Sequence, residues 1–221
     1  ELRTPLSLIL SPLPSLINRE RDGEVVNKLR LIQRNAYRML RMVNDILDLR
    51  RLTKGKEQLR LQHSNLVACV NGLCKQFIGL TNKDITLTML ASAEEINMDF
   101  DVDKVSKIVE NLLSNAFKYA PTQQGRIEVS LRHHNDHVDL VVADNGPGIT
   151  DADKQHLFER FFQSQQNVRS GTGIGLNLVA TYAQMHGGKV SVGDSPQGGA
   201  MFTVTLPLHQ AEIKRKSYAE A

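Results

Sequence analysis

The sequence predicts an α+β fold in two parts: an N-terminal antiparallel helical hairpin over residues 1–53, and an α/β sandwich over residues 57–208. Three observations predict it. Apolar residues at heptad spacing fill the first part, alternating apolar and polar residues mark short strands after residue 84, and helical stretches separate these strands. We expect one sheet covered by helices, with residues 209–221 as a C-terminal tail.

The hairpin is predicted from two runs of apolar residues that step alternately by three and four, as in helices that pack side by side. The members are Leu2, Leu6, Ile9, Leu13 and Leu16, then Leu29, Ile32, Ala36, Met39, Val43 and Ile46. The glycine-containing NRERDGE between them is short enough for a turn. Pro12 and Pro14 predict a second kink or an early end of the first helix. Leu40 and Leu47 remain beside the seam, which favours a homodimeric four-helix bundle over packing on the same chain.

In the second part, helices and strands are predicted in mixed order. A β-hairpin is expected where Ile127, Val129 and Leu131 alternate, Asn135-Asp136 supplies the turn, and Val138, Leu140 and Val142 alternate again. The other predicted elements are helices over 65–79, 101–120 and 174–186, and strands over 85–90, 189–192 and 200–206.

Composition limits the classes of function. A net charge of +3 without a basic stripe argues against a nucleic-acid partner. No apolar run approaches the roughly 18 residues of a membrane span, so we expect no direct membrane contact of this fragment; the absence of a starting methionine leaves room for a membrane segment upstream. Cys69 and Cys74 fit neither a metal motif nor a disulfide framework, and we expect core thiols in a reducing compartment.

The glycine-rich GTGIGL at residues 171–176 is the first candidate for ligand binding. Its spacing and the polar residues before it do not match a dinucleotide-binding turn, and no P-loop motif is present. A glycine-rich turn that enters a helix still offers backbone N–H groups and a positive dipole end to phosphate. A plain helix cap remains the alternative.

The helix over 101–120 carries the second candidate. Asn111, Asn115, Lys118 and Tyr119 fall on one face, opposite the apolar face. Amide oxygens suit a hard cation such as Mg²⁺, which takes few protein ligands besides phosphates and waters, and an ammonium suits phosphate. From this helix alone, a solvated face is an equal alternative.

The third candidate is VVADNGPGI, where a strand ends in Asp144 and is followed by Gly146 and Gly148. A carboxylate there can accept a hydrogen bond from an adenine amino group, although an ordinary turn fits too. Next, Thr150 with Asp153 predicts a helix cap. The short helix after it is expected to bury three aromatic residues beside a mobile segment: Phe158, Phe161 and Phe162.

The histidines give no candidate of comparable strength. His133, His134 and His137 lie at the predicted hairpin turn, and we expect a solvated turn there rather than a metal site. His186 precedes two glycines and is expected to end a helix, where its positive charge suits the dipole.

In order, ENLLSNAFKYA, DNGPGI, LFERFFQ and GTGIGL resemble the N, G1, F and G2 boxes of sensor histidine kinases, and ELRTPL resembles their H box. The resemblance covers about residues 1–207, and LDLRRLTKGKEQL is similar to hybrid sensor kinases.

The resemblance implies an ATP site of the gyrase–kinase–MutL type with ATP and Mg²⁺. Asn115 would coordinate Mg²⁺, Lys118 would contact phosphate, Tyr119 would lie against adenine, and Asp144 would accept from the adenine amino group. The pocket would be shaped by Gly146 and Gly148 and closed by a lid containing Gly171, Gly173 and Gly175, with Thr203 lining the adenine pocket through water. Asn111 stands where related ATPases carry a glutamate base; an amide cannot take a proton, which fits phosphate transfer better than hydrolysis.

The resemblance also places the phosphoacceptor histidine immediately before Glu1, so autophosphorylation is not expected of the printed chain. Glu1 would orient or deprotonate that histidine, and Thr4 would position water for a phosphatase reaction. The expected partners are a second copy, through the helical hairpin, and a response-regulator receiver domain. The expected location is cytoplasmic, as the intracellular part of a membrane-bound sensor. A related ATPase and a nucleotide-binding scaffold without turnover remain the alternatives.

Overall fold

The computed structural model describes residues 3–53, 57–78, 84–164 and 172–208. Within it the chain divides into two units, residues 1–57 and residues 58–221. The first unit is helical. Its helices are α1 (Arg3–Leu10), α2 (Leu13–Arg19) and α3 (Gly23–Thr53).

The first arm of the predicted helical hairpin is two helices rather than one. Helix α1 ends at Leu10, and Pro12 is the N-cap of α2, with Pro14 in the first turn. A proline has no N–H to donate and clashes with the preceding turn, so it ends one helix and begins another more readily than it continues either. Of the two alternatives left open for these prolines, a second kink or an early helix end, the structure shows the early helix end.

One apolar stripe is covered within the hairpin and another is not. Leu6, Leu10, Leu13 and Ala36 are buried, with Leu29 and Leu40 packed beside them. The sequence pattern had placed the residues of both stripes in a single contact between the two arms of the hairpin. Val43 is half-buried, and five other members are at least 47% exposed: Ile9, Leu16, Ile32, Met39 and Ile46. Helices pack through a single stripe each, so the two arms of one chain cover only one face.

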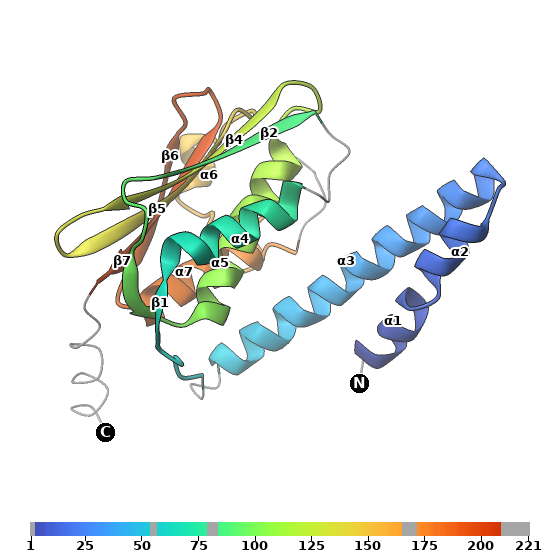
Figure 1. Cartoon of the computed structure of the whole chain (residues 1–221), viewed down its shortest axis with the longest axis horizontal. Helices are drawn as coiled ribbons and strands as arrows, with labels where there is room; N and C mark the ends of the chain where they lie inside the picture. Colours follow the sequence, from blue (N-terminus) through green and yellow to red (C-terminus); the bar gives the residue numbers. More distant parts are fainter. Residues whose placement is uncertain (1–2, 54–56, 79–83, 165–171, 209–221) are drawn as a thin grey trace. The chain divides into compact units, whose positions relative to one another are not determined.

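A five-stranded sheet forms the centre of the second unit, with strand order β2-β4-β5-β7-β6 (Figure 1). Strand β2 is parallel to β4, and every other neighbouring pair is antiparallel. The strands are β2 (Ile85–Ala91), β4 (Gly125–His133), β5 (His137–Asp144), β6 (Lys189–Asp194) and β7 (Ala200–Pro207). The β-hairpin predicted from alternation is confirmed as β4 and β5, and its six alternating residues are at most 1% exposed.

Three helices cover one face of this sheet (Figure 1). They are α4 (Leu66–Ile78), α5 (Val102–Tyr119) and α7 (Gly175–Met185), which confirms the predicted α/β sandwich. A small antiparallel pair, β1 (Gln62–Asn65) and β3 (Asn97–Phe100), was not predicted, because four residues carry too little alternation to recognise.

Both cysteines on α4 are free thiols. Cys74 is buried, as predicted, and burial raises the pKa of its thiol to about 11. Cys69 is only half-buried; burial also raises its pKa, against a hydrogen bond with the Ser106 hydroxyl at 3.9 Å. Neither thiol has the lowered pKa of a reactive cysteine.

His186 ends α7 as predicted, but it is not charged. It is fully buried, its Nδ1 donates to the carbonyl of Tyr182 at 2.7 Å, and its Nε2 accepts from the Asp101 N–H at 3.1 Å. Only a neutral ring can do both. Burial lowers the pKa of His186, which corrects the expectation of a positive charge at this helix end.

Acidification is expected to destabilise the fold through His186. The unfolded chain takes up a proton near the ordinary histidine pKa of about 6.5, whereas the folded chain resists it. Stability from this group is therefore complete above that pH and is lost below it, by at most about 1.4 kcal/mol per pH unit. The free energy of unfolding, measured in urea between pH 5 and 8, should depend less steeply on pH for His186→Gln than for the parent chain, because glutamine keeps an acceptor but does not titrate. The same pH dependence in both chains would contradict this.

Candidate nucleotide site

Helix α5 forms one side of the candidate site. It begins at Val102, and the carboxylate of the preceding residue, Asp101, accepts from the Lys104 N–H at 3.1 Å and so caps the first turn. The apolar face of α5 is buried, and it packs beside α4 and α7. The opposite face, as predicted, carries four half-buried polar residues: Asn111, Asn115, Lys118 and Tyr119.

The two asparagines of α5 have different environments. The Asn111 amide nitrogen donates to the Lys107 carbonyl at 2.8 Å. Its Oδ1 faces the first residue of α7, Gly175, where an added Cβ would come within 2.6 Å. By contrast, the Asn115 side chain makes no hydrogen bond with any residue that the structure describes. Its carboxamide oxygen therefore fits the coordination of a hard cation.

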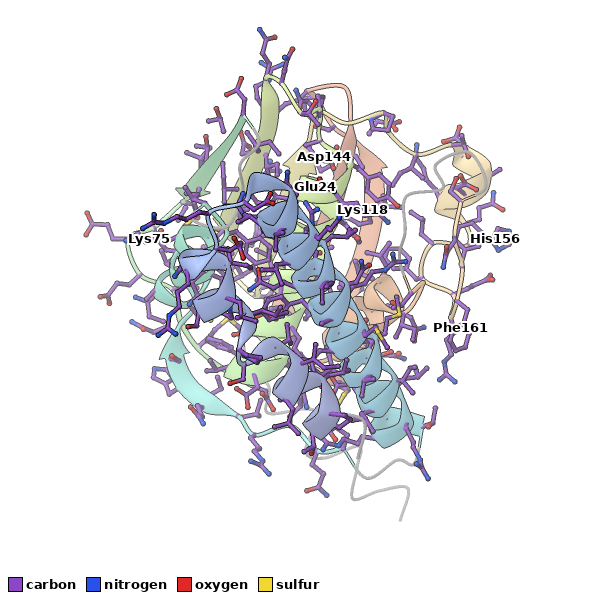
Figure 2. The ribbon with its side chains drawn as sticks, turned by 90° about the vertical axis from the view of Figure 1, so that its right-hand side faces the viewer. Glu24, Lys75, Lys118, Asp144, His156 and Phe161 are labelled. Atoms are coloured by element: carbon purple, nitrogen blue, oxygen red, sulfur yellow. The ribbon has the colours of Figure 1, made fainter. Side chains whose placement is uncertain are left out.

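Lys118 and Tyr119 place a cation and an aromatic ring together near the C-terminal end of α5. The Lys118 ammonium donates to the Tyr119 hydroxyl at 2.8 Å and lies 4.4 Å from the ring centroid. Figure 2 labels Lys118 and Asp144, which come from α5 and β5. The two elements meet at Gly146, where an added Cβ would lie 3.0 Å from the Tyr119 carbonyl and 2.8 Å from the Asp144 carboxylate.

Asp144 ends β5, and the residue is only 5% exposed. Its Oδ1 accepts from the backbone N–H groups of Gly146 at 2.8 Å and Ala200 at 3.3 Å. Burial raises the pKa of Asp144, while these two hydrogen bonds lower it. Both bonds from described residues fall on Oδ1, so Oδ2 can accept from a ligand. A buried acceptor of this kind discriminates strongly between ligands that do and do not donate to it.

The turn between β6 and β7 closes over Asp144, which the sequence did not reveal. A Cβ at Gly199 would overlap the Asp144 carbonyl, the Asp144 carboxylate and the Gly146 nitrogen. Gly198 and Gly148 both take positive φ, +97° and +72°, and the predicted pocket glycine Gly148 lies beside this turn. The sequence signal was the glycine pair in SPQGGA.

We expect Gly199→Ala to weaken both folding and nucleotide binding, because the turn must move away from Asp144 to admit a methyl group. Overpacking of this kind costs about 1–3 kcal/mol of the free energy of unfolding, measurable in urea. Gly72→Ala is the matched control: nothing lies within 4 Å of its added Cβ, on helix α4, so it should stabilise by about 1 kcal/mol. A Gly199→Ala protein as stable as the parent would contradict this packing.

The glycine-rich segment meets the aromatic segment before it. The Phe161 N–H donates to the Gly173 carbonyl at 2.9 Å, and a Cβ on Gly173 (φ +69°) would come within 2.6 Å of the Phe161 backbone. Asn177 of α7 donates to the Phe158 carbonyl at 2.8 Å. Gly173 and Gly175 are thus placed between the aromatic segment and Asn111. Gly171 lies outside the described residues.

The expectation of three buried phenylalanines is wrong. Thr150 caps a helix as predicted, accepting from Asp153 N–H at 3.2 Å, but α6 ends at Lys154. Phe161 is 63% exposed (Figure 2) and takes a positive φ of 65°. Phe158 and Phe162 are half-buried. The chain leaves the helix too early to turn all three rings inward.

One predicted site residue of the second unit, Thr203, is turned away from Asp144. Thr203 pairs with Val141 and Ser191, on the opposite face of the sheet from Val142 and Phe202, because successive side chains of a strand alternate. It does not line the pocket, and Ala200 is the β7 residue that contacts Asp144. Thr4 is exposed on α1 in the first unit, and Glu1 lies outside the described residues.

Comparisons with known proteins identify the family. Residues 100–210 match the model described as histidine kinase-, DNA gyrase B- and HSP90-like ATPase, and residues 1–55 match the His kinase A (phospho-acceptor) domain. The chain is 38% identical to the sensor histidine kinase TmoS of Ectopseudomonas mendocina, over 96% of this chain and 22% of that protein. It is 36% identical to hybrid signal transduction histidine kinase D of Dictyostelium discoideum, over 94% of this chain and 14% of that protein.

Among solved structures, full-length ShkA in complex with AMPPNP matches with a TM-score of 0.75 and 25% identity, over 95% of this chain and 44% of that one. Of the two histidine kinases matched by sequence, TmoS and histidine kinase D, the chain spans less than a quarter of the length. It belongs to the ATP-binding family of histidine kinases, DNA gyrase B and HSP90, within the histidine kinases of two-component systems. No helix in the described part of the chain is long and apolar enough to cross a membrane.

Proposed function

We propose that this chain is the ATP-dependent kinase core of a two-component sensor. The observation that carries the proposal is the buried Asp144 acceptor, joined through Gly146 to the end of the helix that bears Asn111, Asn115, Lys118 and Tyr119. In the reaction, a histidine ring nitrogen attacks the γ-phosphorus of ATP, the bond to the β,γ-bridging oxygen breaks, and ADP leaves. The phosphoryl group then passes to an aspartate of a receiver domain.

Each residue of the site has a distinct part in this scheme. The Asp144 carboxylate accepts from the adenine amino group, Tyr119 lies against the base, and the Lys118 ammonium contacts phosphate. Asn115 would hold Mg²⁺, which neutralises phosphate charge when bound. Gly171, Gly173 and Gly175 belong to the segment that closes over the triphosphate. Asn111 cannot take a proton, so it cannot serve as the base that activates water.

The phosphate acceptor in this proposal is a histidine that precedes Glu1 in the natural protein. The ELRTP motif and the phospho-acceptor domain match over residues 1–55 support it. Glu1 then orients or deprotonates the imidazole. Thr4, exposed on α1, positions a water molecule when the domain removes phosphate from its receiver.

Two copies of the helical hairpin are proposed to form the four-helix bundle. The exposed stripe of Ile9, Leu16, Ile32, Met39 and Ile46 supports this, because a second hairpin would bury it. A receiver domain, separate or fused, is the second protein partner. The cytoplasmic side of a membrane-bound sensor is the proposed location.

Calorimetry with a non-hydrolysable ATP analogue and Mg²⁺, with a parallel assay for phosphate release from ATP, tests the proposal on the printed chain. We expect one nucleotide per chain and no steady release of phosphate, because a kinase site without its acceptor does not turn over. Steady release would instead support an ATPase of the same family, and no nucleotide binding would refute the site.

A further inference from the structure

The tip of the β4–β5 hairpin brings together three side chains that can bind a metal. This tip projects from one end of the sheet (yellow in Figure 1). His134 follows β4, and its backbone N–H donates to the His137 carbonyl at 2.9 Å, which closes the turn. His137 and Asp139 stand two residues apart on β5 and so share one face. One ligand atom from each of these three residues lies within 4.8 Å of the other two.

One of the two measured distances matches tetrahedral zinc, and the other exceeds the range for zinc ligands by about 0.3 Å, which a small rotation of the His137 ring would close. Asp139 Oδ2 lies 3.4 Å from Nε2 of His134 and 3.9 Å from Nε2 of His137. Atoms that share a tetrahedral zinc at about 2.0–2.2 Å stand roughly 3.3–3.6 Å apart. The two imidazole rings are stacked at 4.4 Å between centroids with an interplanar angle of 20°, so both present the same edge to Asp139.

Hydrogen bonds outside the cluster orient two of the three ligands. Nδ1 of His137 is 2.6 Å from Asp136 Oδ1, which leaves its Nε2 for a metal. The Thr205 hydroxyl donates to Asp139 Oδ1 at 2.7 Å, which leaves Oδ2 for the same metal. A carboxylate behind a histidine ligand and a donor behind a carboxylate ligand are the usual outer partners of protein metal sites.

Contrary to the solvated turn expected from the sequence, we propose that His134, His137 and Asp139 bind Zn²⁺ through Nε2, Nε2 and Oδ2, with water as the fourth ligand. Two imidazoles and one carboxylate favour zinc over the all-oxygen coordination of Mg²⁺. The site is separate from the nucleotide site, because Asp139 and Asp144 are five residues apart on an extended strand, about 17 Å. The ion would fasten the turn to β5 and, through Thr205, to β7.

The nearby positive charge does not block this site. Arg132 stands opposite Asp139 in the β4–β5 register and is exposed. It forms no ion pair with Asp139 among the described residues. Its side chain can extend into solvent while Zn²⁺ takes the carboxylate.

Zinc titration of the full chain against a chromophoric chelator tests the site, with Co²⁺ absorption as a second probe of tetrahedral coordination. We expect one Zn²⁺ per chain. Loss of an outer partner costs roughly 10–100-fold in metal affinity, and we expect that loss for Asp136→Asn. Zinc binding should weaken by more than this when a direct ligand is removed, as in Asp139→Asn, His134→Ala and His137→Ala. ATP-analogue affinity should be unchanged in all four.

Two histidines serve as controls. His133→Ala removes the neighbouring histidine of the same turn, and His63→Ala removes a histidine 2.9 Å from a single carboxylate, Asp99. Both should bind zinc like the parent chain. No stoichiometric binding at micromolar zinc, or equal affinity in the parent chain and the Asp139→Asn and His134→Ala variants, would overturn the proposal.

Discussion

Asp144→Asn is expected to bind ATP roughly 10- to 100-fold more weakly than the parent chain. A hydrogen bond to a charged acceptor contributes about 1.5–3 kcal/mol, and every 1.4 kcal/mol is about tenfold in affinity. The amide oxygen can still accept from Gly146 and Ala200, so the fold should persist. Calorimetry with ATP and GTP measures the change.

Base preference separates this role of Asp144 from a structural one. Adenine donates from its amino group, whereas guanine presents a carbonyl oxygen at that position, so the carboxylate should favour ATP. In Asp144→Asn the amide can donate to guanine, and the ratio of ATP to GTP affinity should fall. Asp99→Asn, an exposed carboxylate paired with His63, is the control. An unchanged ratio in Asp144→Asn would contradict adenine recognition by this carboxylate.

Asn115→Ala is expected to abolish the contribution of Mg²⁺ to nucleotide binding. Its carboxamide is the one on the polar face of α5 that makes no hydrogen bond with a described residue, whereas Asn111 is held by the Lys107 carbonyl. Loss of a direct ligand should cost more than the roughly 10–100-fold that loss of an outer partner costs. ATP affinity measured with Mg²⁺ and with a chelator gives the readout.

The chelator measurement is the internal control for this prediction. Without Mg²⁺, Asn115→Ala and the parent chain should bind ATP equally, because in the proposed site the amide contacts the cation rather than the nucleotide. Asn97→Ala, on strand β3, where the exposed amide donates to Glu95 at 3.2 Å, should behave as the parent chain in both conditions. An equal loss with and without Mg²⁺ would show that Asn115 shapes the pocket instead of holding the cation.

Much of the second unit could be predicted because its periodicity is unambiguous. The alternation of Ile127, Val129 and Leu131 can only place one face of a strand in a core, and these residues are buried as expected. The helical hairpin was harder. Heptad spacing shows that a residue is apolar on a helix face, but it does not show which neighbour covers it. Leu13 and Ile9 therefore looked alike, although one is buried and the other exposed.

The candidate site was predictable where its residues lie on one element or directly follow it. Helical spacing put Asn111 and Lys118 on one face, and a strand end marked Asp144. Gly199 was missed because its role depends on β7 lying next to β5, a pairing between distant segments. The prediction that Thr203 lines the adenine pocket failed for a different reason. The buried alternation of Phe202 and Val204 already turned Thr203 to the other face.

Phosphate mapping on a longer chain, with the natural residues before Glu1 restored, tests the proposed kinase activity most directly. After incubation with Mg²⁺ and ATP, acid-labile phosphate is located by mass spectrometry. We expect it on a histidine immediately before Glu1, and we expect phosphorylation of the Asp144→Asn chain at limiting ATP to be roughly 10- to 100-fold slower. ATP bound without any phosphoprotein, or phosphate released steadily into solution, would contradict the kinase assignment.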